Sequence, residues 1–219
     1  MTRTAYLGLG ANVGDPLETL AAAVDVLDTI DGITVVDVSG VYRTRPWPPP
    51  DDPRAVPQDD FLNLVVRAET TLAPHRLLRE LQLTEEAFGR DRESEQRWGP
   101  RTLDIDLLLL GDEVVDTPEL TLPHPRLAER AFVLIPLLEV MPDGALPDGR
   151  RLTRLLMDLS PVEGIDLEVR LEDVPGPRIP RPAGPGGPPP SLERPGFDDV
   201  AGEHGADRDA ERPPPEDGG

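Results

Sequence analysis

The chain has 219 residues and a formal net charge of −20, since 42 Asp and Glu residues stand against 22 Arg, and it contains neither Lys nor Cys. The absence of Cys excludes disulfide bonds and thiolate metal sites, and the excess negative charge disfavours nucleic acids and anionic membranes as partners. The length fits one domain with a substantial core. Neither a signal-peptide pattern nor an apolar run near the ~20 residues of a membrane span is present, so we expect a cytoplasmic protein.

Hydrophobic periodicity and turn residues divide the first half of the chain into six elements. Their order is strand, helix, strand, strand, helix, strand, at residues 4–9, 14–30, 32–44, 61–71, 74–90 and 102–110. The first helix has a well-marked start, with Asp15 as the expected N-cap, Pro16 at the first helical position and Glu18 completing a capping-box pattern.

This order, β-α-β-β-α-β, predicts an α+β fold of the ferredoxin-like class, with an antiparallel sheet and helices packed on one face. We expect the other face of the sheet to be free for a ligand. A C-terminal extension follows the sixth element. In it we expect a turn, two helices and a last strand, at residues 111–120, 132–140, 152–159 and 166–171.

The composition changes sharply near residue 175. Residues 176–219 contain 11 Pro and 9 Gly but few large apolar side chains, so this segment cannot bury enough surface to offset the entropy of ordering it. We therefore expect a folded domain at residues 1–175 and a disordered, acidic, Pro- and Gly-rich tail at residues 176–219. A Pro-rich docking segment is the alternative, but the tail lacks a well-formed recognition motif.

Two carboxylates interrupt the leucine-rich strand at residues 102–110. In an extended chain Asp104 and Asp106 share one face, while Leu103, Ile105 and Leu107 share the other. The pair could simply form the solvated face of an edge strand. However, like charges ~5 Å apart destabilise each other unless a cation lies between them, and Mg²⁺ is often held by one or two carboxylates together with nucleotide phosphates. The pattern therefore favours a magnesium site.

The loop before this strand supplies positive charge in an otherwise acidic chain. It contains Arg90, Arg92, Arg97 and Arg101. Guanidinium groups match phosphate oxygens in bidentate geometry, so carboxylates, metal ions and arginines together are typical of phosphoryl transfer. Because the chain has neither a P-loop nor a kinase Gly-rich loop, the nucleotide must be held in another way.

Six motifs follow one another in a recognisable order: GLGANVGDP, VYRT, DFLNLVV, RWGPRTLDIDLLLLG, LPHPR and ERAFVLIPL. Over residues 5–159 they resemble the 6-hydroxymethyl-7,8-dihydropterin pyrophosphokinase family. The resemblance implies an ATP- and Mg-dependent pyrophosphokinase of folate biosynthesis. Such an enzyme transfers pyrophosphate from ATP to the pterin's hydroxymethyl group, giving the pterin diphosphate and AMP. It also implies two Mg²⁺ ions, and we expect a monomer with the pterin and ATP as its small-molecule partners.

The resemblance also implies roles for individual residues. Catalysis would belong to Arg90, Arg92, Arg101, Asp104 and Asp106, and the two aspartates would be the metal ligands. ATP would be bound by Gln82, Glu85, Arg97, Trp98, Leu107, Thr121, His124 and Arg130. The pterin would be bound by Asn12, Thr44, Pro46, Phe61, Asn63 and Phe132. The arginine-rich loop, with Trp98, would close over the site.

Alternatives remain open for several of these residues. Phe61 and Phe132 could be ordinary core residues, which is the commoner fate of Phe, and His124 could be structural. Asn63 lies two residues after Phe61, so both should point to the same face of their strand. A binding module without catalysis and an RNA-binding domain of the same topology are the rival functions. The intact aspartates and arginines disfavour the first, and the acidity and few aromatic residues disfavour the second.

Overall fold

The computed structural model describes residues 1–46, 52–90 and 99–173. The strands are β1 (Arg3–Ala11), β2 (Ile33–Val38), β3 (Val41–Thr44), β4 (Phe61–Thr70), β5 (Asp104–Leu110), β6 (Val115–Asp116), β7 (Thr121–Leu122) and β8 (Ile165–Val169). The α-helices are α1 (Pro16–Thr29), α2 (Pro74–Ala87), α3 (Ala131–Val140) and α4 (Leu152–Asp158). Short 3₁₀ turns lie at Leu127–Glu129 and Leu171–Asp173.

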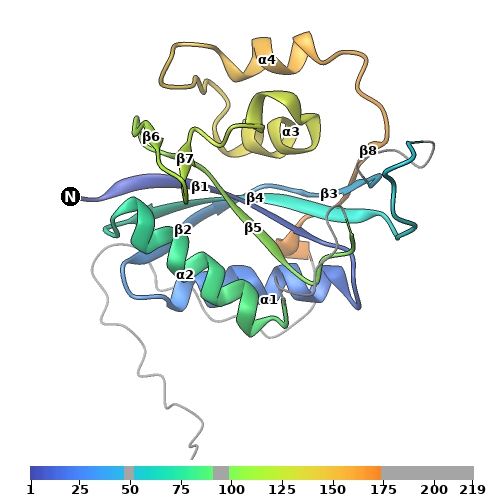
Figure 1. The fold of residues 1–219 in the computed structure, drawn as a ribbon, viewed down its shortest axis with the longest axis horizontal. Helices are drawn as coiled ribbons and strands as arrows, with labels where there is room; N and C mark the ends of the chain where they lie inside the picture. Colours follow the sequence, from blue (N-terminus) through green and yellow to red (C-terminus); the bar gives the residue numbers. More distant parts are fainter. Residues whose placement is uncertain (47–51, 91–98, 174–219) are drawn as a thin grey trace, which may run out of the picture. The chain divides into compact units, whose positions relative to one another are not determined.

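The main sheet is antiparallel and has the strand order β5-β1-β4-β3-β8, with β2 also paired to β4. The first six expected elements therefore form the ferredoxin-like arrangement, and this prediction is confirmed. The last expected strand is also present, because β8 pairs with β3 and extends the sheet at its edge (Figure 1). The segment expected to be a turn forms the small β6-β7 hairpin.

One expected strand is divided into two. The segment 32–44 forms β2 and β3, which pair with successive parts of the same edge of β4. Between them, Ser39 Oγ accepts a hydrogen bond from Val65 N (2.9 Å) and donates one to Gly40 O (2.8 Å). Gly40 N donates to Glu139 Oε2 of α3 (3.1 Å). The prediction of one continuous strand was wrong because these side-chain hydrogen bonds replace the regular ladder at this point.

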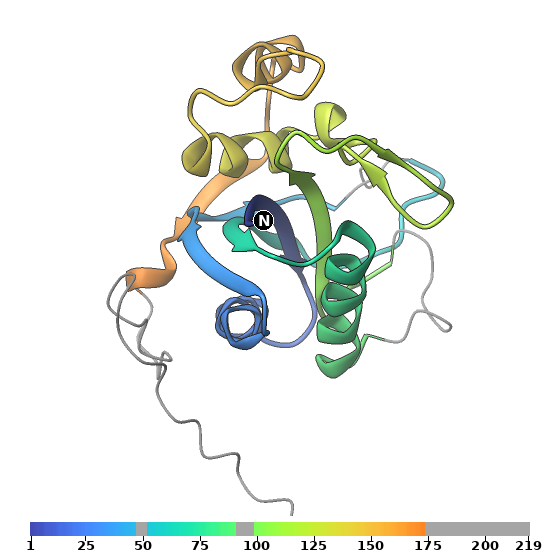
Figure 2. The same cartoon turned by 90° about the vertical axis from the view of Figure 1, so that its left-hand side faces the viewer.

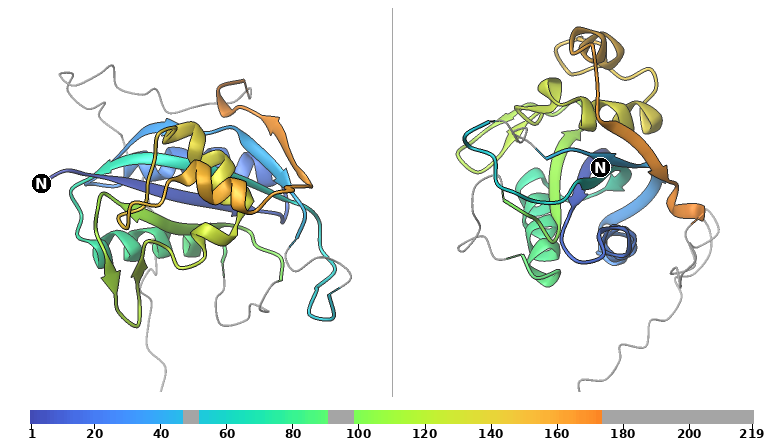
Figure 3. Two further views of the ribbon diagram at one scale, coloured as in Figure 1. Left: turned by 90° about the horizontal axis from the view of Figure 1, so that it is seen from above. Right: turned by 90° about the vertical axis from the view of Figure 1, so that its right-hand side faces the viewer.

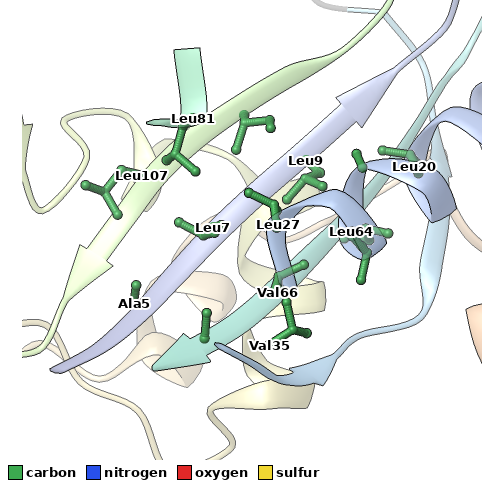
Figure 4. Close-up of a cluster of buried hydrophobic side chains, with 14 of the residues drawn as sticks. Ala5, Leu7, Leu9, Leu20, Leu27, Val35, Leu64, Val66, Leu81 and Leu107 are labelled. Atoms are coloured by element: carbon green, nitrogen blue, oxygen red, sulfur yellow. The ribbon is translucent and has the colours of Figure 1, made fainter. Parts of the chain in front are cut away.

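Helices α1 and α2 cover one face of the sheet (Figures 1 and 2). The expected start of α1 is confirmed, since Asp15 Oδ1 accepts a hydrogen bond from Glu18 N (3.0 Å). Alternate residues of the strands, including Leu7 and Leu64, pack here against Leu20 and Leu27 of α1 (Figure 4). The period-two pattern of the strands thus supplies the main core.

The opposite face of the sheet is covered in part by the C-terminal extension. Helix α3 lies over β4, and α4 lies beyond α3 (Figure 3). Val65 and Leu108 of the sheet are buried with Leu134 and Leu137 of α3. The expectation of a free second face therefore does not hold where α3 packs on β4.

The tail prediction falls outside the structure's coverage. Residues 174–219 are not among the described residues, so the domain boundary at residue 175 stays a prediction. Within the described part of the chain, no helix combines the length and the apolar character needed to cross a membrane.

Candidate active site

The two carboxylates of β5 lie on the second face of the sheet, as expected. Asp104 and Asp106 retain 38% and 33% of their side-chain exposure, whereas Ile105 and Leu107 are buried in the core beneath α1 and α2. The strand therefore presents acid on one face and hydrocarbon on the other.

A cavity of about 170 Å³ opens above these carboxylates, between the sheet and the start of α3. It brings together eight of the residues that the sequence predicted for the site. These are Thr44, Phe61, Asn63, Arg101, Asp104, Asp106, Arg130 and Phe132. They come from three strands, two loops and one helix, so only the folded chain assembles them.

Two glycines of β1 form part of the cavity floor, and the sequence analysis gave them no role. Gly10 lies directly opposite Asp104, and Gly8 lies directly opposite Asp106. A Cβ atom at position 10 would come within 2.8 Å of Asn63 Oδ1, so only glycine fits without a shift. The signal was present in the sequence, because glycines at alternate positions of a strand leave one face without side chains.

The cavity is lined by aromatic side chains and, next to one of them, by a side chain that can form hydrogen bonds. Phe61 and Asn63 both point from β4 into the cavity, as expected for residues two apart on a strand. Asn63 Nδ2 donates a hydrogen bond to Thr44 Oγ1 (2.7 Å). Phe132, at the start of α3, also lines the cavity, with the Arg130 guanidinium carbon 5.6 Å from its ring centroid. This lining suits a flat heterocycle with a hydrogen-bonding edge.

Each aspartate has an arginine partner. The Arg90 guanidinium contacts Asp104, and Arg130 Nη1 lies 3.4 Å from Asp106 Oδ2. Even so, burial and the neighbouring Asp104 raise the pKa of Asp106 to about 7. Burial thus disfavours the charged form of Asp106, and a bound cation would stabilise that form.

His124 stands close to Asp106 in a neutral state. Its Nε2 lies 3.8 Å from Asp106 Oδ1, and its Nδ1 accepts a hydrogen bond from Arg126 N (3.2 Å). Burial, and then the charge of Arg130, lower the pKa of His124 to about 4. The two side chains therefore do not form an ion pair at neutral pH, and the Nε2–H is directed toward the acidic end of the cavity.

Two residues expected to bind ATP have buried side chains. Glu85 of α2 is 1% exposed, and it accepts a hydrogen bond from Ile105 N (2.7 Å) as well as contacting Arg90. Its carboxylate therefore fixes the β5 backbone between the two aspartates. Leu107 is 3% exposed and points into the core, so only its backbone is available to a nucleotide.

Asn12 is also engaged with the protein itself. Its Nδ2 donates to Gln58 Oε1 and to Asp59 O, both at 3.0 Å, and its Oδ1 accepts from Arg101 N (2.7 Å). Asn12 N also donates to Arg101 O (3.0 Å). It does not line the cavity, and its visible role is to hold Arg101 at the cavity's edge.

The remaining predicted residues lie outside the lining of this cavity or outside the described residues. Gln82 and Thr121 do not line it, and Pro46 lines an adjoining pocket that shares Thr44 and Phe132 with it. Arg92, Arg97 and Trp98 fall within residues 91–98, which the structure does not describe.

The oxygen atoms of Asp104 and Asp106 could bind a cation that a bound ligand also coordinates. Within residues 1–46, 52–90 and 99–173, no three His, Cys, Asp or Glu side chains form a group able to hold a metal ion by themselves. The two aspartates alone offer hard oxygen donors from one strand face. Mg²⁺ is commonly bound in this way, by one or two carboxylates with phosphate oxygens and water completing the octahedron.

The family model for 7,8-dihydro-6-hydroxymethylpterin-pyrophosphokinase (HPPK) matches residues 6–142 of the chain. The chain belongs to this family. The 2-amino-4-hydroxy-6-hydroxymethyldihydropteridine pyrophosphokinase of Pseudomonas aeruginosa is 43% identical over 166 residues, which cover 76% of this chain and 97% of that protein. The enzyme of the same name from Methylorubrum extorquens is 47% identical over 161 residues, which cover 74% and 96%.

A solved structure shares the HPPK fold with the chain. The crystal structure of wild-type Plasmodium falciparum HPPK-DHPS matches with a TM-score of 0.54 at 14% identity, covering 72% of this chain and 45% of that one. The chain thus spans less than half of the Plasmodium protein's length, and this likeness concerns the fold alone. The expected α+β fold class and the resemblance to this family are both confirmed.

Proposed function

We propose that the chain, a pyrophosphokinase of folate biosynthesis by its family, takes the pyrophosphoryl group from ATP and requires two Mg²⁺ ions held by Asp104 and Asp106. The observation that supports this most directly is the position of the two carboxylates. They lie side by side on the cavity floor, opposite two glycines that leave room above them. Burial, and then the charge of Asp104, raises the pKa of Asp106 to about 7, and a divalent ion there would stabilise the charged carboxylates.

The pterin would lie against the aromatic side chains of the cavity. Phe61 from β4 and Phe132 from α3 offer apolar faces to the cavity, and Asn63 offers an amide to the polar edge of the ring. With that edge held by Asn63 and Thr44, the hydroxymethyl group would extend toward the aspartates. The same residues would thereby hold the nucleophilic oxygen in line with the phosphate it attacks.

The nucleotide would lie on the acidic side of the cavity. Bound Mg²⁺ would neutralise phosphate charge and lower the pKa of the attacking hydroxyl. Arg101 and Arg130, which both line the cavity, would contact phosphate oxygens, and the neutral His124 could donate its Nε2–H. Gln82 and Thr121 would contribute from the surrounding elements, and Arg92, Arg97 and Trp98 from the loop outside the described residues.

The reaction needs no strong protein base. The hydroxymethyl oxygen forms a bond to the β-phosphorus of ATP, and the hydroxyl proton passes to water. The bond between that phosphorus and the oxygen that bridges to the α-phosphate breaks, and the electron pair leaves with AMP. The chain's contribution is then to align the two substrates and to stabilise the shifting charge.

An AMP-release assay tests the proposal. Wild-type protein should form AMP only when ATP, Mg²⁺ and 6-hydroxymethyl-7,8-dihydropterin are all present. Asp104→Asn and Asp106→Asn should each lower kcat by at least ~100-fold while the far-ultraviolet circular dichroism spectrum is unchanged. Arg43→Gln, in an exposed ion pair with Glu168, is a matched control that should retain turnover. Near-normal turnover in both aspartate variants would refute the metal role.

A further inference from the structure

The guanidinium of Arg90 occupies one oxygen of a carboxylate that is expected to bind a metal ion. Its Nη1 contacts both Asp104 Oδ1, an expected metal ligand, and Glu85 Oε1. The Arg90 side chain is 7% exposed and Glu85 is 1% exposed. This is therefore a buried cation between two carboxylates rather than a surface ion pair, and its charge is little screened by solvent.

Arg90 and a divalent ion cannot both use the same side of Asp104. A metal ion on the Asp104 oxygen would lie within a few ångströms of the guanidinium, and two positive charges at that distance repel each other, the more so because the Arg90 side chain is 7% exposed. Some displacement of Arg90 must accompany metal binding at Asp104 Oδ1.

We propose that Arg90 serves as the built-in counter-ion of the ligand-free site, and that the metal–nucleotide complex binds by exchange with it. The divalent ion takes over Asp104, and the guanidinium moves away from Asp104. This inference rests on the proposed function, because it takes Asp104 as a metal ligand. It adds that the chain suppresses binding of a divalent ion alone, since the ion must first displace a buried arginine.

Glu85 keeps the Arg90 guanidinium close to the site during the exchange. Its carboxylate is fixed by the hydrogen bond from Ile105 N (2.7 Å), and it remains buried whether or not a metal ion is present. A buried carboxylate without a cation is strongly unfavourable, so Arg90 keeps Glu85 as a partner while it gives up Asp104. Glu85 is on this view a positioning residue for Arg90 and for β5.

Titration of the full-length protein with Mn²⁺ alone, followed by the electron paramagnetic resonance signal of the unbound ion, tests this exchange. Removing the built-in cation with Arg90→Gln should tighten Mn²⁺ binding by about tenfold or more, which is the effect of 1.4 kcal/mol. Arg67→Gln, which removes an equal charge from a partly exposed pair with Asp37, should change it by less than about twofold. Adding Asp104→Asn to Arg90→Gln should abolish the gain.

A second comparison guards against a folding defect, since Arg90→Gln leaves Glu85 buried without this cation. Glu85→Gln/Arg90→Gln removes both charges and should bind Mn²⁺ about tenfold more tightly than Glu85→Gln alone. The exchange would be overturned if Mn²⁺ affinity were the same in Arg90→Gln as in the wild type and the same in Glu85→Gln/Arg90→Gln as in Glu85→Gln. It would also be overturned if Arg90→Gln still bound Mn²⁺ more tightly after Asp104→Asn was added. AMP formation by the wild type is measured independently, so loss of the exchange and loss of the proposed function are distinguishable.

Discussion

Gly10 of β1 and Asp104 of β5 lie directly opposite each other in the antiparallel register, so the residue beside the carboxylate has no side chain. The space above Gly10 is bounded by the Asn63 amide, which a Cβ atom would approach to 2.8 Å. We predict that Gly10→Ala displaces Asn63 and raises KM for the pterin by about tenfold, the effect of losing one good hydrogen bond. Steady-state kinetics with the pterin varied at saturating ATP measures this.

Gly8→Ala provides the comparison. A Cβ atom there would meet Leu108 at 3.4 Å, an ordinary contact, so Asn63 should stay in place. Its KM for the pterin should rise less than that of Gly10→Ala. Equal KM values for Gly10→Ala and wild type would show that Asn63 does not read the pterin from this position.

Asn12 should act through Arg101 rather than through the substrate. Asn12→Ala removes the acceptor for Arg101 N and both side-chain donor bonds to the loop at residues 58–59. We expect a loss of ~1–3 kcal/mol in the free energy of unfolding, from buried groups left without partners, together with a lower kcat. Denaturant unfolding and the AMP assay measure the two effects.

The variant Asn12→Asp distinguishes a role in positioning Arg101 from direct binding of the substrate. Aspartate keeps the oxygen that accepts from Arg101 N, so its kcat should lie closer to wild type than that of Asn12→Ala. If KM for the pterin rises in both variants while kcat is unchanged, Asn12 contacts the substrate instead.

The raised pKa of Asp106 predicts a pH-dependent cost in stability. In the folded, metal-free protein its pKa is about 7, against an ordinary 3.8. From pH 4 to pH 7 the unfolded chain therefore releases this proton before the folded chain does, and the stability contributed by Asp106 is lost as the pH rises. Asp106→Asn cannot ionise. Its melting temperature relative to wild type should rise between pH 4 and pH 8, by about 2–4 °C per kcal/mol.

The melting temperature of Asp106→Asn must be compared with that of the wild type at each pH, because another group also changes the stability with pH. His124 has a pKa lowered to about 4 from 6.5, so its contribution is present above pH 6.5 and is lost as the pH falls toward 4, the opposite trend. Asp106 also keeps 33% of its side-chain exposure, so solvent reduces the effect. A constant difference in melting temperature from pH 4 to pH 8 would contradict the raised pKa.

Most of the fold could be predicted because the relevant signals are local. Alternating leucines and valines indicated the strands, and Asp15 with Pro16 marked the start of α1. The division between β2 and β3 could not be predicted, because it depends on hydrogen bonds from Ser39 to β4 and from Gly40 to Glu139, far away in the sequence. The placement of α3 over the second face likewise depends on long-range packing.

The parts of the candidate site whose residues lie close together in one strand or one motif could be predicted. The shared face of Asp104 and Asp106 follows from the pleat of β5, and that of Phe61 and Asn63 from the pleat of β4. The contacts of Glu85 and Asn12 with other parts of the protein could not be predicted. They join residues that are far apart in the sequence, and the spacing of residues does not reveal such contacts. The glycines opposite the aspartates required the strand register.

Removal of the tail should leave the enzyme intact. Residues 176–219 have the composition of a segment that cannot form a core, so truncation after Ile179 should change kcat/KM by less than about twofold and hardly shift the melting temperature. Parallel kinetics and thermal unfolding of the two forms measure this. A large loss of activity would show that the tail contributes to the site.

The proposed function depends on Asp104 and Asp106 together binding the divalent ions that let an acidic protein hold ATP. The decisive experiment is a crystal structure of the protein with Mg²⁺ and a non-hydrolysable ATP analogue. We predict magnesium ions in contact with both aspartates and with the nucleotide's phosphate oxygens. A fully occupied nucleotide with no ion touching either aspartate would contradict the account.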